Sequence, residues 1–130
     1  MIDLHPTVCN ICGGKVVWIS NDIIYGRLYG SGYMYFCTKC HAYVGTHNNK
    51  PRKAKGILAN KEMRKWKVRC HKLFDSMWYN SKQRDYLYNK LADELNISVY
   101  DCHFGYFDIP MLQKSYDILK KWRCKPNVFD

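Results

Sequence analysis

Two hydrophobic periodicities divide the chain. Before residue 50, apolar and aromatic residues form short runs rich in Val, Ile, Tyr and Trp, which are typical of β-strands. The runs lie at residues 15–20, 22–29, 33–37 and 42–45. Gly30-Ser31-Gly32 predicts a hairpin turn between the second and third. Residues 48–55 are polar and basic and include Pro51, so the pattern predicts a loop or linker there.

After residue 60, apolar residues recur every three or four positions, which indicates amphipathic helices. The first helix begins after Asn60, a plausible N-cap, and Ser81 is the candidate cap of the second. Asp108 with Pro110 predicts the start of the third. The three apolar stripes are Met63, Trp66, Cys70, Leu73, Phe74 and Met77; then Leu87, Leu91 and Leu95; then Leu112, Tyr116, Leu119 and Trp122.

These elements predict an α+β fold. Residues 1–50 are expected to form a zinc ribbon, a small antiparallel sheet, and residues 51–130 a three-helix unit packed against it as one compact unit. The chain has 130 residues, and no apolar run approaches the roughly 18 needed to cross a bilayer. The first residues lack the pattern of a signal peptide, so we expect a soluble protein in the cytoplasm of a bacterial host.

The cysteine spacing carries the firmest chemical prediction. Cys9-x-x-Cys12 is followed, after 24 residues, by Cys37-x-x-Cys40, and each pair can turn two sulfurs towards one ion. Four thiolates in tetrahedral geometry suit one structural Zn²⁺, with an iron–sulfur centre as the lesser alternative. His41 is a weaker candidate ligand. Such a site is closed and leaves no open position for catalysis.

Three further cysteines, Cys70, Cys102 and Cys124, are scattered. Cys70 lies on an apolar stripe and is expected to be a buried thiol. Cys102 and His103, with His71, offer a second metal site as an alternative, but buried structural roles are favoured.

Positive charge is concentrated in one segment. The formal net charge is +10, which four thiolates and one Zn²⁺ would reduce to about +8. Between residues 50 and 72 only Glu62 opposes ten basic residues. We expect this loop and helix to contact nucleic-acid phosphates, DNA or RNA, through Arg52, Lys53, Lys55, Lys61, Arg64, Lys65, Arg69 and Lys72. A solvated helix face is the alternative.

Two other groups of residues are candidates for function. Tyr25, Tyr29, Tyr33 and Tyr35 are candidates for base stacking wherever they face outward. A polar strip on the first helix, at the border of its apolar stripe, contains His71 and Asp75, and Arg84 and His103 are candidates to approach it. The strip suits acid–base chemistry or phosphate binding, but a satisfied structural network is favoured.

No catalytic residue is assigned. A His-Asn-His nuclease would place its general-base histidine between the cysteine pairs, and no histidine lies between Cys12 and Cys37. Neither a phosphate-cradling glycine loop nor a Ser-His-Asp arrangement is visible. A binding protein is therefore favoured over an enzyme.

Several motifs together resemble a family of small bacterial and bacteriophage proteins described as a zinc-finger-containing domain of unknown function. The resemblance extends from about Cys9 to about Trp122. It rests on Cys9-Asn-Ile-Cys12, Tyr25-Gly-Arg-Leu-Tyr29-Gly, Cys37-Thr-Lys-Cys40-His-Ala-Tyr-Val-Gly45-Thr-His47, His71-Lys-Leu-Phe-Asp75-Ser-Met-Trp78, residues 84–92 and Cys102-His103-Phe-Gly.

The resemblance implies a phage or mobile-element origin and assigns no activity. Two hypotheses therefore follow. The first is a nucleic-acid-binding zinc protein. The alternative is a phage effector that binds and inhibits a host protein, such as a CRISPR or other defence nuclease.

Overall fold

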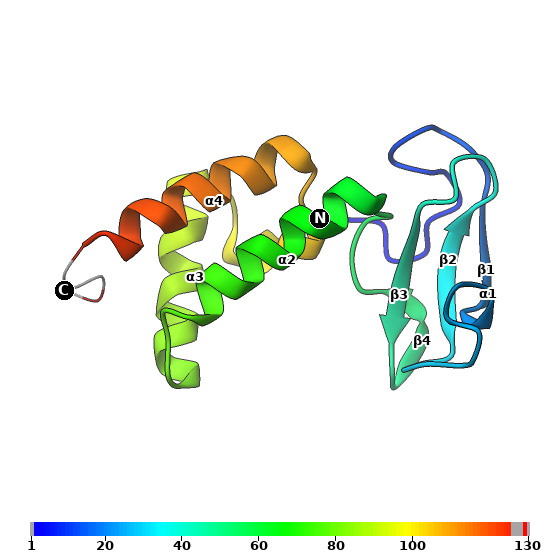
Figure 1. Ribbon diagram of the computed structural model, residues 1–130, viewed down its shortest axis with the longest axis horizontal. Coiled ribbons are helices and arrows are strands. Elements are labelled where there is room, and N and C mark those ends of the chain that lie inside the picture. Colours follow the sequence, from blue (N-terminus) through cyan, green and yellow to red (C-terminus); the bar gives the residue numbers. More distant parts are fainter. Residues whose placement is uncertain (1, 126–128, 130) are drawn as a thin grey trace. The chain divides into compact units, whose positions relative to one another are not determined.

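The computed structural model describes residues 2–125 and residue 129 (Figure 1). The chain forms two compact units, Ile2–Lys61 and the residues from Glu62 onwards. The first contains the sheet, and the second contains the three long helices. The fold class is α+β, as the hydrophobic pattern predicts.

The first unit is a four-stranded antiparallel sheet in which each strand pairs with the next along the chain. Its strands are β1 (Val16–Ser20), β2 (Tyr33–Cys37), β3 (Tyr43–His47) and β4 (Lys50–Ala54). Val16 lies opposite Cys37 and Met34 opposite Gly45. The predicted strands at 15–20, 33–37 and 42–45 are thereby confirmed, and their predicted ends differ from those of β1, β2 and β3 by no more than two residues.

The prediction of a loop at residues 48–55 is wrong, because β4 occupies this segment. β4 is an edge strand, where proline and lysines are tolerated because one row of backbone groups needs no partner. Side chains of the sheet hold it: the Trp18 indole donates a 2.8 Å hydrogen bond to the Pro51 carbonyl, and the Tyr35 hydroxyl donates one to the Arg52 carbonyl.

The predicted strand at 22–29 is also wrong. The segment begins with a short helix, α1 (Asp22–Tyr25), and continues as a turn. The partner of β2 is β1, so the residues between them form a long connection rather than a strand. Asn21, which is buried, holds this connection by accepting a hydrogen bond from the Tyr29 amide and donating one to the Tyr29 carbonyl.

A small core lies beneath the sheet. It joins strand residues to the segment after β4, where Leu58 is fully buried. The Asn10 side chain donates to the Leu58 carbonyl and accepts from its amide, at 3.0 and 2.9 Å. The segment up to Ala59, which bridges to Tyr43, therefore belongs to the first unit.

The second unit contains α2 (Lys61–Asp75), α3 (Ser81–Leu95) and α4 (Ile109–Arg123), with 3₁₀ turns η1 (Val99–Asp101) and η2 (Phe104–Tyr106). All three predicted helices are present. Asn80, not Ser81, caps α3 by accepting a hydrogen bond from the Gln83 amide, and Asp108 caps α4 as predicted.

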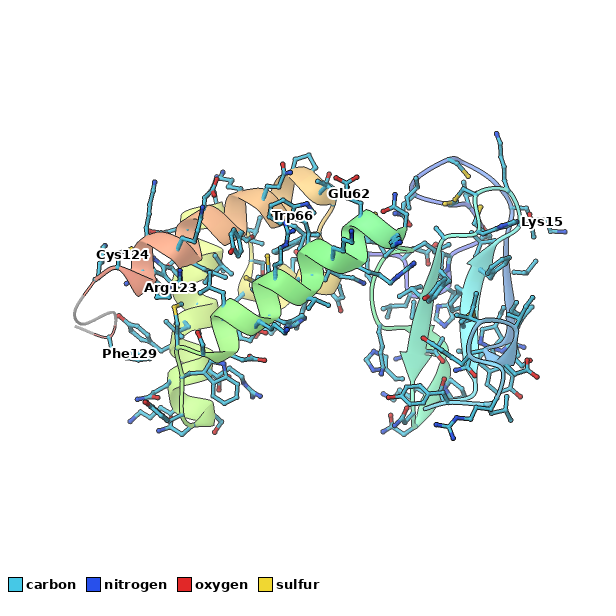
Figure 2. All side chains as sticks on the ribbon, viewed as in Figure 1. Lys15, Glu62, Trp66, Arg123, Cys124 and Phe129 are labelled. Carbon is cyan, nitrogen blue, oxygen red and sulfur yellow. The ribbon has the colours of Figure 1, made fainter. Side chains whose placement is uncertain are left out.

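The helical core contains most of the three predicted stripes. The members buried there are Cys70, Leu73, Phe74, Leu87, Leu91, Leu95, Leu112, Leu119 and Trp122. Met63, near the start of α2, is buried but lies outside this cluster. Phe104 from η2 completes it with an edge-on contact to Phe74. Trp66, which is labelled on α2 in Figure 2, packs edge-on against Tyr116, so α2 and α4 meet through an aromatic pair.

Among the described residues, no helix is both long and apolar enough to cross a membrane.

Candidate metal centre

Four cysteine sulfurs meet at one end of the sheet. The Sγ atoms of Cys9, Cys12, Cys37 and Cys40 all lie within 4.8 Å of one another. In Figure 2 sulfur atoms gather on the side of the sheet marked by Lys15. The structure therefore brings together the four cysteines that their spacing predicts as ligands.

The sulfur separations fit a tetrahedral zinc ion. Zn–S bonds of about 2.3 Å place the corners of a tetrahedron about 3.8 Å apart. Cys9 and Cys40 have their Sγ atoms 3.7 Å apart, and Cys12 and Cys37 have theirs 3.4 Å apart. The four cysteines thus form a site that would hold one zinc ion. As all four ligands come from the protein, the role of the ion is structural.

The two Cys-x-x-Cys turns have the same backbone construction. In the first, the Cys9 amide donates to the Gly14 carbonyl and the Gly13 amide to the Cys9 carbonyl. In the second, the Cys37 amide donates to the Ala42 carbonyl and the His41 amide to the Cys37 carbonyl.

Gly13 and His41 occupy equivalent corners of these turns, and both are left-handed, with φ of 75° and 66°. This explains the place of His41 better than metal ligation does. Its ring stacks on Phe36 at a centroid distance of 5.4 Å, and the described cluster of potential ligands contains the four cysteines and not His41.

Backbone amides point at the sulfurs. The Ile11 amide donates to Cys9 Sγ and the Gly14 amide to Cys12 Sγ, both at 3.3 Å. The amides of Lys39 and Cys40 donate to Cys37 Sγ, both at 3.4 Å. Such hydrogen bonds stabilise negative charge on sulfur and orient the ligands around a cation.

The four thiols lie close enough for their ionisation to be coupled. Burial raises the pKa of Cys37, but the amide hydrogen bonds and neighbouring thiols outweigh it and lower the pKa to about 6. At Cys40 the Ala42 amide lowers the pKa, yet burial and the neighbouring cysteines raise it to about 12. One thiolate therefore disfavours ionisation of the next, and a divalent cation removes this conflict.

The remaining cysteines lie elsewhere, in the second unit. Cys70 and Cys102 are buried, and burial raises the pKa of their thiols to about 12 and about 11. Cys70 donates a hydrogen bond to the Leu112 carbonyl. No second metal cluster joins Cys102, His103 and His71 within the residues that the structure describes. Cys124 is exposed.

The predicted basic residues lie on both units. On α2, Lys61, Lys65, Arg69 and Lys72 are exposed, while Arg64 is half-buried. On β4 and just after it, Arg52 and Lys55 are exposed and Lys53 is half-buried. The guanidinium of Arg52 lies 3.9 Å from the centroid of the Trp18 ring, which fixes its position on the sheet.

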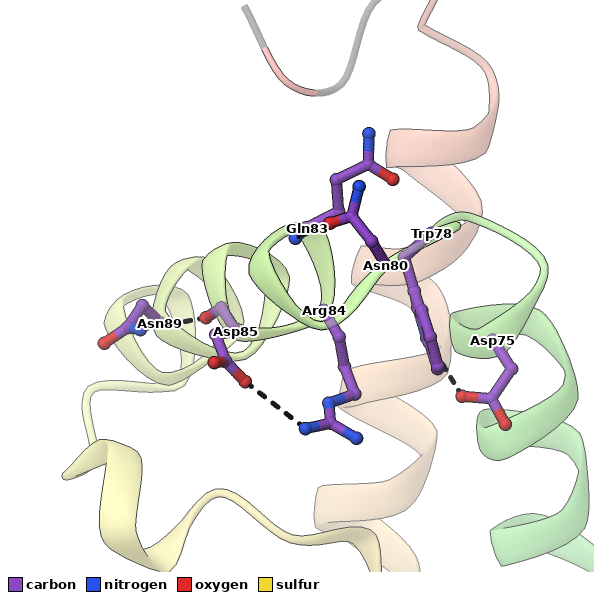
Figure 3. A network of polar contacts seen from close by, with 7 residues as sticks. All are labelled: Asp75, Trp78, Asn80, Gln83, Arg84, Asp85 and Asn89. Carbon is purple, nitrogen blue, oxygen red and sulfur yellow. Dashed lines mark hydrogen bonds and ion pairs between the residues drawn. The ribbon is translucent and has the colours of Figure 1, made fainter.

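The candidate polar strip is largely committed to internal contacts (Figure 3). Asp75 accepts a 3.1 Å hydrogen bond from the Trp78 indole, and Arg84 lies over the Trp78 ring and 3.7 Å from Asp85. His71 meets the Phe104 ring edge-on at 4.9 Å. No hydrogen bond joins His71 to Asp75 within the described part of the chain.

Sequence reasoning did not single out Tyr88 on α3, which lies near Asp75, Arg84 and His103 of the candidate polar strip. Burial raises the pKa of Tyr88, Asp75 and Cys102 raise it further, and Arg84 lowers it. Its ring lies 6.5 Å from that of His103 and 4.3 Å from that of Phe74. The sequence signal was the position of Tyr88 beside Leu87 and Leu91 at the edge of an apolar stripe.

Comparison with other proteins agrees with the cysteine site. The model of a family described as a zinc-finger-containing domain matches residues 5–122, and so includes all four cysteines. The chain belongs to this family. No curated protein and no solved structure matches the chain. Membership, with the geometry of the four sulfurs, makes this a zinc-finger protein.

Proposed function

We propose that this zinc-finger protein binds nucleic acid, DNA or RNA, through phosphate contacts made by its exposed basic side chains. The observation that carries the proposal is a row of cations on α2. Lys61, Lys65, Arg69 and Lys72 project from neighbouring turns, all exposed. Such a row suits a phosphate backbone, since it attracts repeated negative charge without reading sequence.

The row lacks local neutralisation. The ion pairs Arg84–Asp85 and Lys120–Asp117 both lie outside α2. None of the four cations of the row takes part in an ion pair among the described residues. Glu62 is the only acidic residue in the first turns of the helix. The formal charge of +10 on the chain also favours binding to a polyanion such as nucleic acid.

The sheet adds a second basic surface with a different character. The Trp18 ring stacks on Tyr33, with centroids 4.1 Å apart and planes 8° apart, and Arg52 covers Trp18. The stack holds the Arg52 guanidinium in place, which reduces the entropy that it would lose on binding a phosphate. In this proposal the zinc ion stabilises the sheet and does not itself contact the nucleic acid.

Fluorescence anisotropy with labelled duplex and single-stranded DNA and RNA tests the proposal. Binding should be detectable at low salt, and the logarithm of the association constant should fall linearly with the logarithm of salt concentration. Absence of binding to all four oligonucleotides at low salt would overturn it. The zinc-loaded full chain should be used, because loss of the ribbon would mimic a negative result.

An effector that binds and inhibits a host protein remains the second proposal, and it includes the bacteriophage origin that the sequence motifs imply. The exposed apolar side chains at residues 23–29 favour it, because such patches often mark protein interfaces. Salt-insensitive binding of a purified host protein, in a chain that binds no oligonucleotide, would favour this alternative.

A further inference from the structure

The connection between β1 and β2 exposes an unusual amount of apolar surface. Within seven residues, five large side chains are exposed, namely Ile23, Ile24, Tyr25, Leu28 and Tyr29. Tyr29 is 64% exposed and Tyr25 48%. Burying these groups would be favourable, so their exposure on a small protein calls for a ligand. We refer to residues 22–30 as the tyrosine loop.

The tyrosine loop is held in one conformation. The buried Asn21 side chain pairs with both backbone groups of Tyr29, at 2.6 and 3.1 Å. The Gly26 amide donates to the Asp22 carbonyl at 2.7 Å, with Gly26 at a φ of 74° that favours glycine. The Gly32 amide donates to the Tyr29 carbonyl at 2.9 Å. A loop fixed in this way presents its tyrosines at little entropic cost on binding.

A hollow of about 90 Å³ lies beside this loop. Three tyrosines contribute to its wall, with the rings of Tyr25 and Tyr29 at a centroid distance of 5.4 Å. Its polar groups are amide, hydroxyl and ammonium, from Asn21, Ser31, Thr46 and Lys55, and its lining includes no carboxylate. It is far smaller than the roughly 300–1,000 Å³ of pockets that enclose a small molecule. It would admit one edge of a flat ring while the ring face lies against tyrosine.

We infer that the tyrosine loop binds an unpaired nucleobase, so that the nucleic acid recognised by this protein is single-stranded. The inference rests on the proposed function and specifies its substrate class. An aromatic base supplies the flat apolar face that the tyrosine rings can stack on. The Asn21, Ser31 and Thr46 side chains already hydrogen-bond within the unit and shape the hollow rather than bind the base. Lys55 in the hollow and the exposed Arg27 in the loop supply cations for the attached phosphates.

Duplex nucleic acid does not offer this combination, because its base faces are stacked inside the helix. A protein ligand would match the exposed apolar side chains. It would not account for the hollow, whose wall contains the Lys55 ammonium group and no carboxylate. The observations therefore favour the unpaired base.

The test compares two strands of equal charge. A 12-nucleotide oligothymidine and an abasic strand of the same length carry the same phosphates, but only the first has bases. Zinc-loaded wild-type protein should bind oligothymidine more tightly. In the Tyr25→Ala/Tyr29→Ala variant, the affinity for oligothymidine should fall by roughly 5- to 150-fold, the range expected for loss of one stacked base, and affinity for the abasic strand should stay constant.

Two control variants separate stacking from other effects. Tyr25→Phe/Tyr29→Phe should retain most of the preference for oligothymidine, because the ring face is kept. Tyr79→Ala/Tyr100→Ala removes two tyrosines that are 95% and 81% exposed in the other unit, and should bind as the wild type does. Zinc content and melting temperature confirm that each variant is folded.

The outcomes distinguish this inference from the proposed function. Equal affinity of the wild type for oligothymidine and the abasic strand would overturn the inference and leave phosphate binding intact. A protein ligand that is lost in the alanine variant, with oligothymidine binding unchanged, would also overturn it. Binding of neither strand at low salt would overturn both.

Discussion

Gly14 lies so close to Lys39 that a Cβ atom added to Gly14 would be 2.6 Å from the Cβ atom of Lys39. The same atom would lie 3.0 Å from Cys37 Sγ and 3.1 Å from Cys12 Sγ. The two Cys-x-x-Cys turns therefore touch at a point that only glycine fits, and the metal centre depends on this contact.

Replacing Gly14 with alanine should weaken zinc binding, because the turns must separate before the added methyl group fits. A clash of this kind in a packed site destabilises by about 1–3 kcal/mol. Competition with a chromogenic chelator measures the zinc affinity, and thermal melting measures the stability. Gly45→Ala is the matched control, since nothing lies within 4 Å of its added Cβ atom. Equal zinc affinity in the two variants would contradict the role of Gly14.

Removing zinc should unfold the first unit and leave the helices. The core of the second unit, which includes Leu91, Leu112 and Trp122, contains none of the four ligands, whereas Cys9 and Cys37 belong to the core of the first. Chelation should abolish the dispersed amide signals of β1 to β4 in NMR spectra while the helical circular dichroism at 222 nm is largely kept. Readdition of zinc should restore the signals. Loss of both at the same chelator concentration would contradict this independence.

The thiols should differ sharply in reactivity. Of seven cysteines, four are metal ligands, and Cys70 and Cys102 are buried with raised pKa values. An aromatic disulfide reagent should therefore modify one thiol rapidly in the zinc-loaded protein, and seven after denaturation with chelator. Cys124→Ser should remove the rapid phase, because Cys124 is the exposed thiol outside the metal centre. A rapid phase that survives this substitution would show that the zinc site is open.

His71 should titrate below its ordinary pKa of 6.5, because partial burial against the helical core lowers its pKa. Asp75 raises this pKa and Lys67 lowers it. In NMR titrations Asp75→Asn should therefore lower the pKa of His71, and Lys67→Gln should raise it. If the pKa of His71 shifted in the same direction in both variants, the opposite effects assigned to Asp75 and Lys67 would be contradicted.

The same shift predicts how stability depends on pH. As pH falls through 6.5, the unfolded chain takes up a proton at His71 before the folded chain does. The His71 contribution to stability is thus present above 6.5, and is lost as pH falls towards the folded-state pKa. Below pH 6.5, thermal melts of the wild type should therefore lose stability more steeply with falling pH than those of His71→Gln, and above pH 6.5 the two should depend on pH alike. Equal slopes below pH 6.5 would contradict the lowered pKa of His71.

Neutralising the basic row should reduce the salt dependence of binding to single-stranded DNA. Changing Lys61, Lys65, Arg69 and Lys72 together to glutamine would remove up to four phosphate contacts and lower the log–log salt slope by up to about 2.8. A control with the same charge change uses Lys82, Lys114, Lys121 and Arg123, which are exposed on α3 and α4. An equal loss of slope in both variants would indicate general attraction by net charge rather than contacts along α2.

Local patterns sufficed for the helices and the metal ligands. The helices repeat their apolar residues over 15 positions each, and two Cys-x-x-Cys pairs impose nearly the same turn wherever they occur. Six predicted members of the α2 and α4 stripes are buried in the helical core. Cys70 is one of them, and its position on the stripe alone indicated its burial.

Long-range contacts explain what the patterns missed. β4 has the composition of a linker, and it is a strand because Trp18 and Tyr35 bind the carbonyls of Pro51 and Arg52. The apolar residues of 22–29 suggest a strand, but Asn21 bends them into an exposed loop. Tyr88 was missed because its neighbours Asp75 and Arg84 come from other turns and helices.

The order of the strands has a consequence for synthesis on the ribosome. Each strand after β1 pairs with the strand made just before it, and the four zinc ligands all lie among the first 40 residues. The metal can therefore be captured while the helices are still being translated, because no later segment is needed to close the coordination sphere. A newly made chain would then carry a finished, zinc-locked sheet ahead of an unfinished helical part.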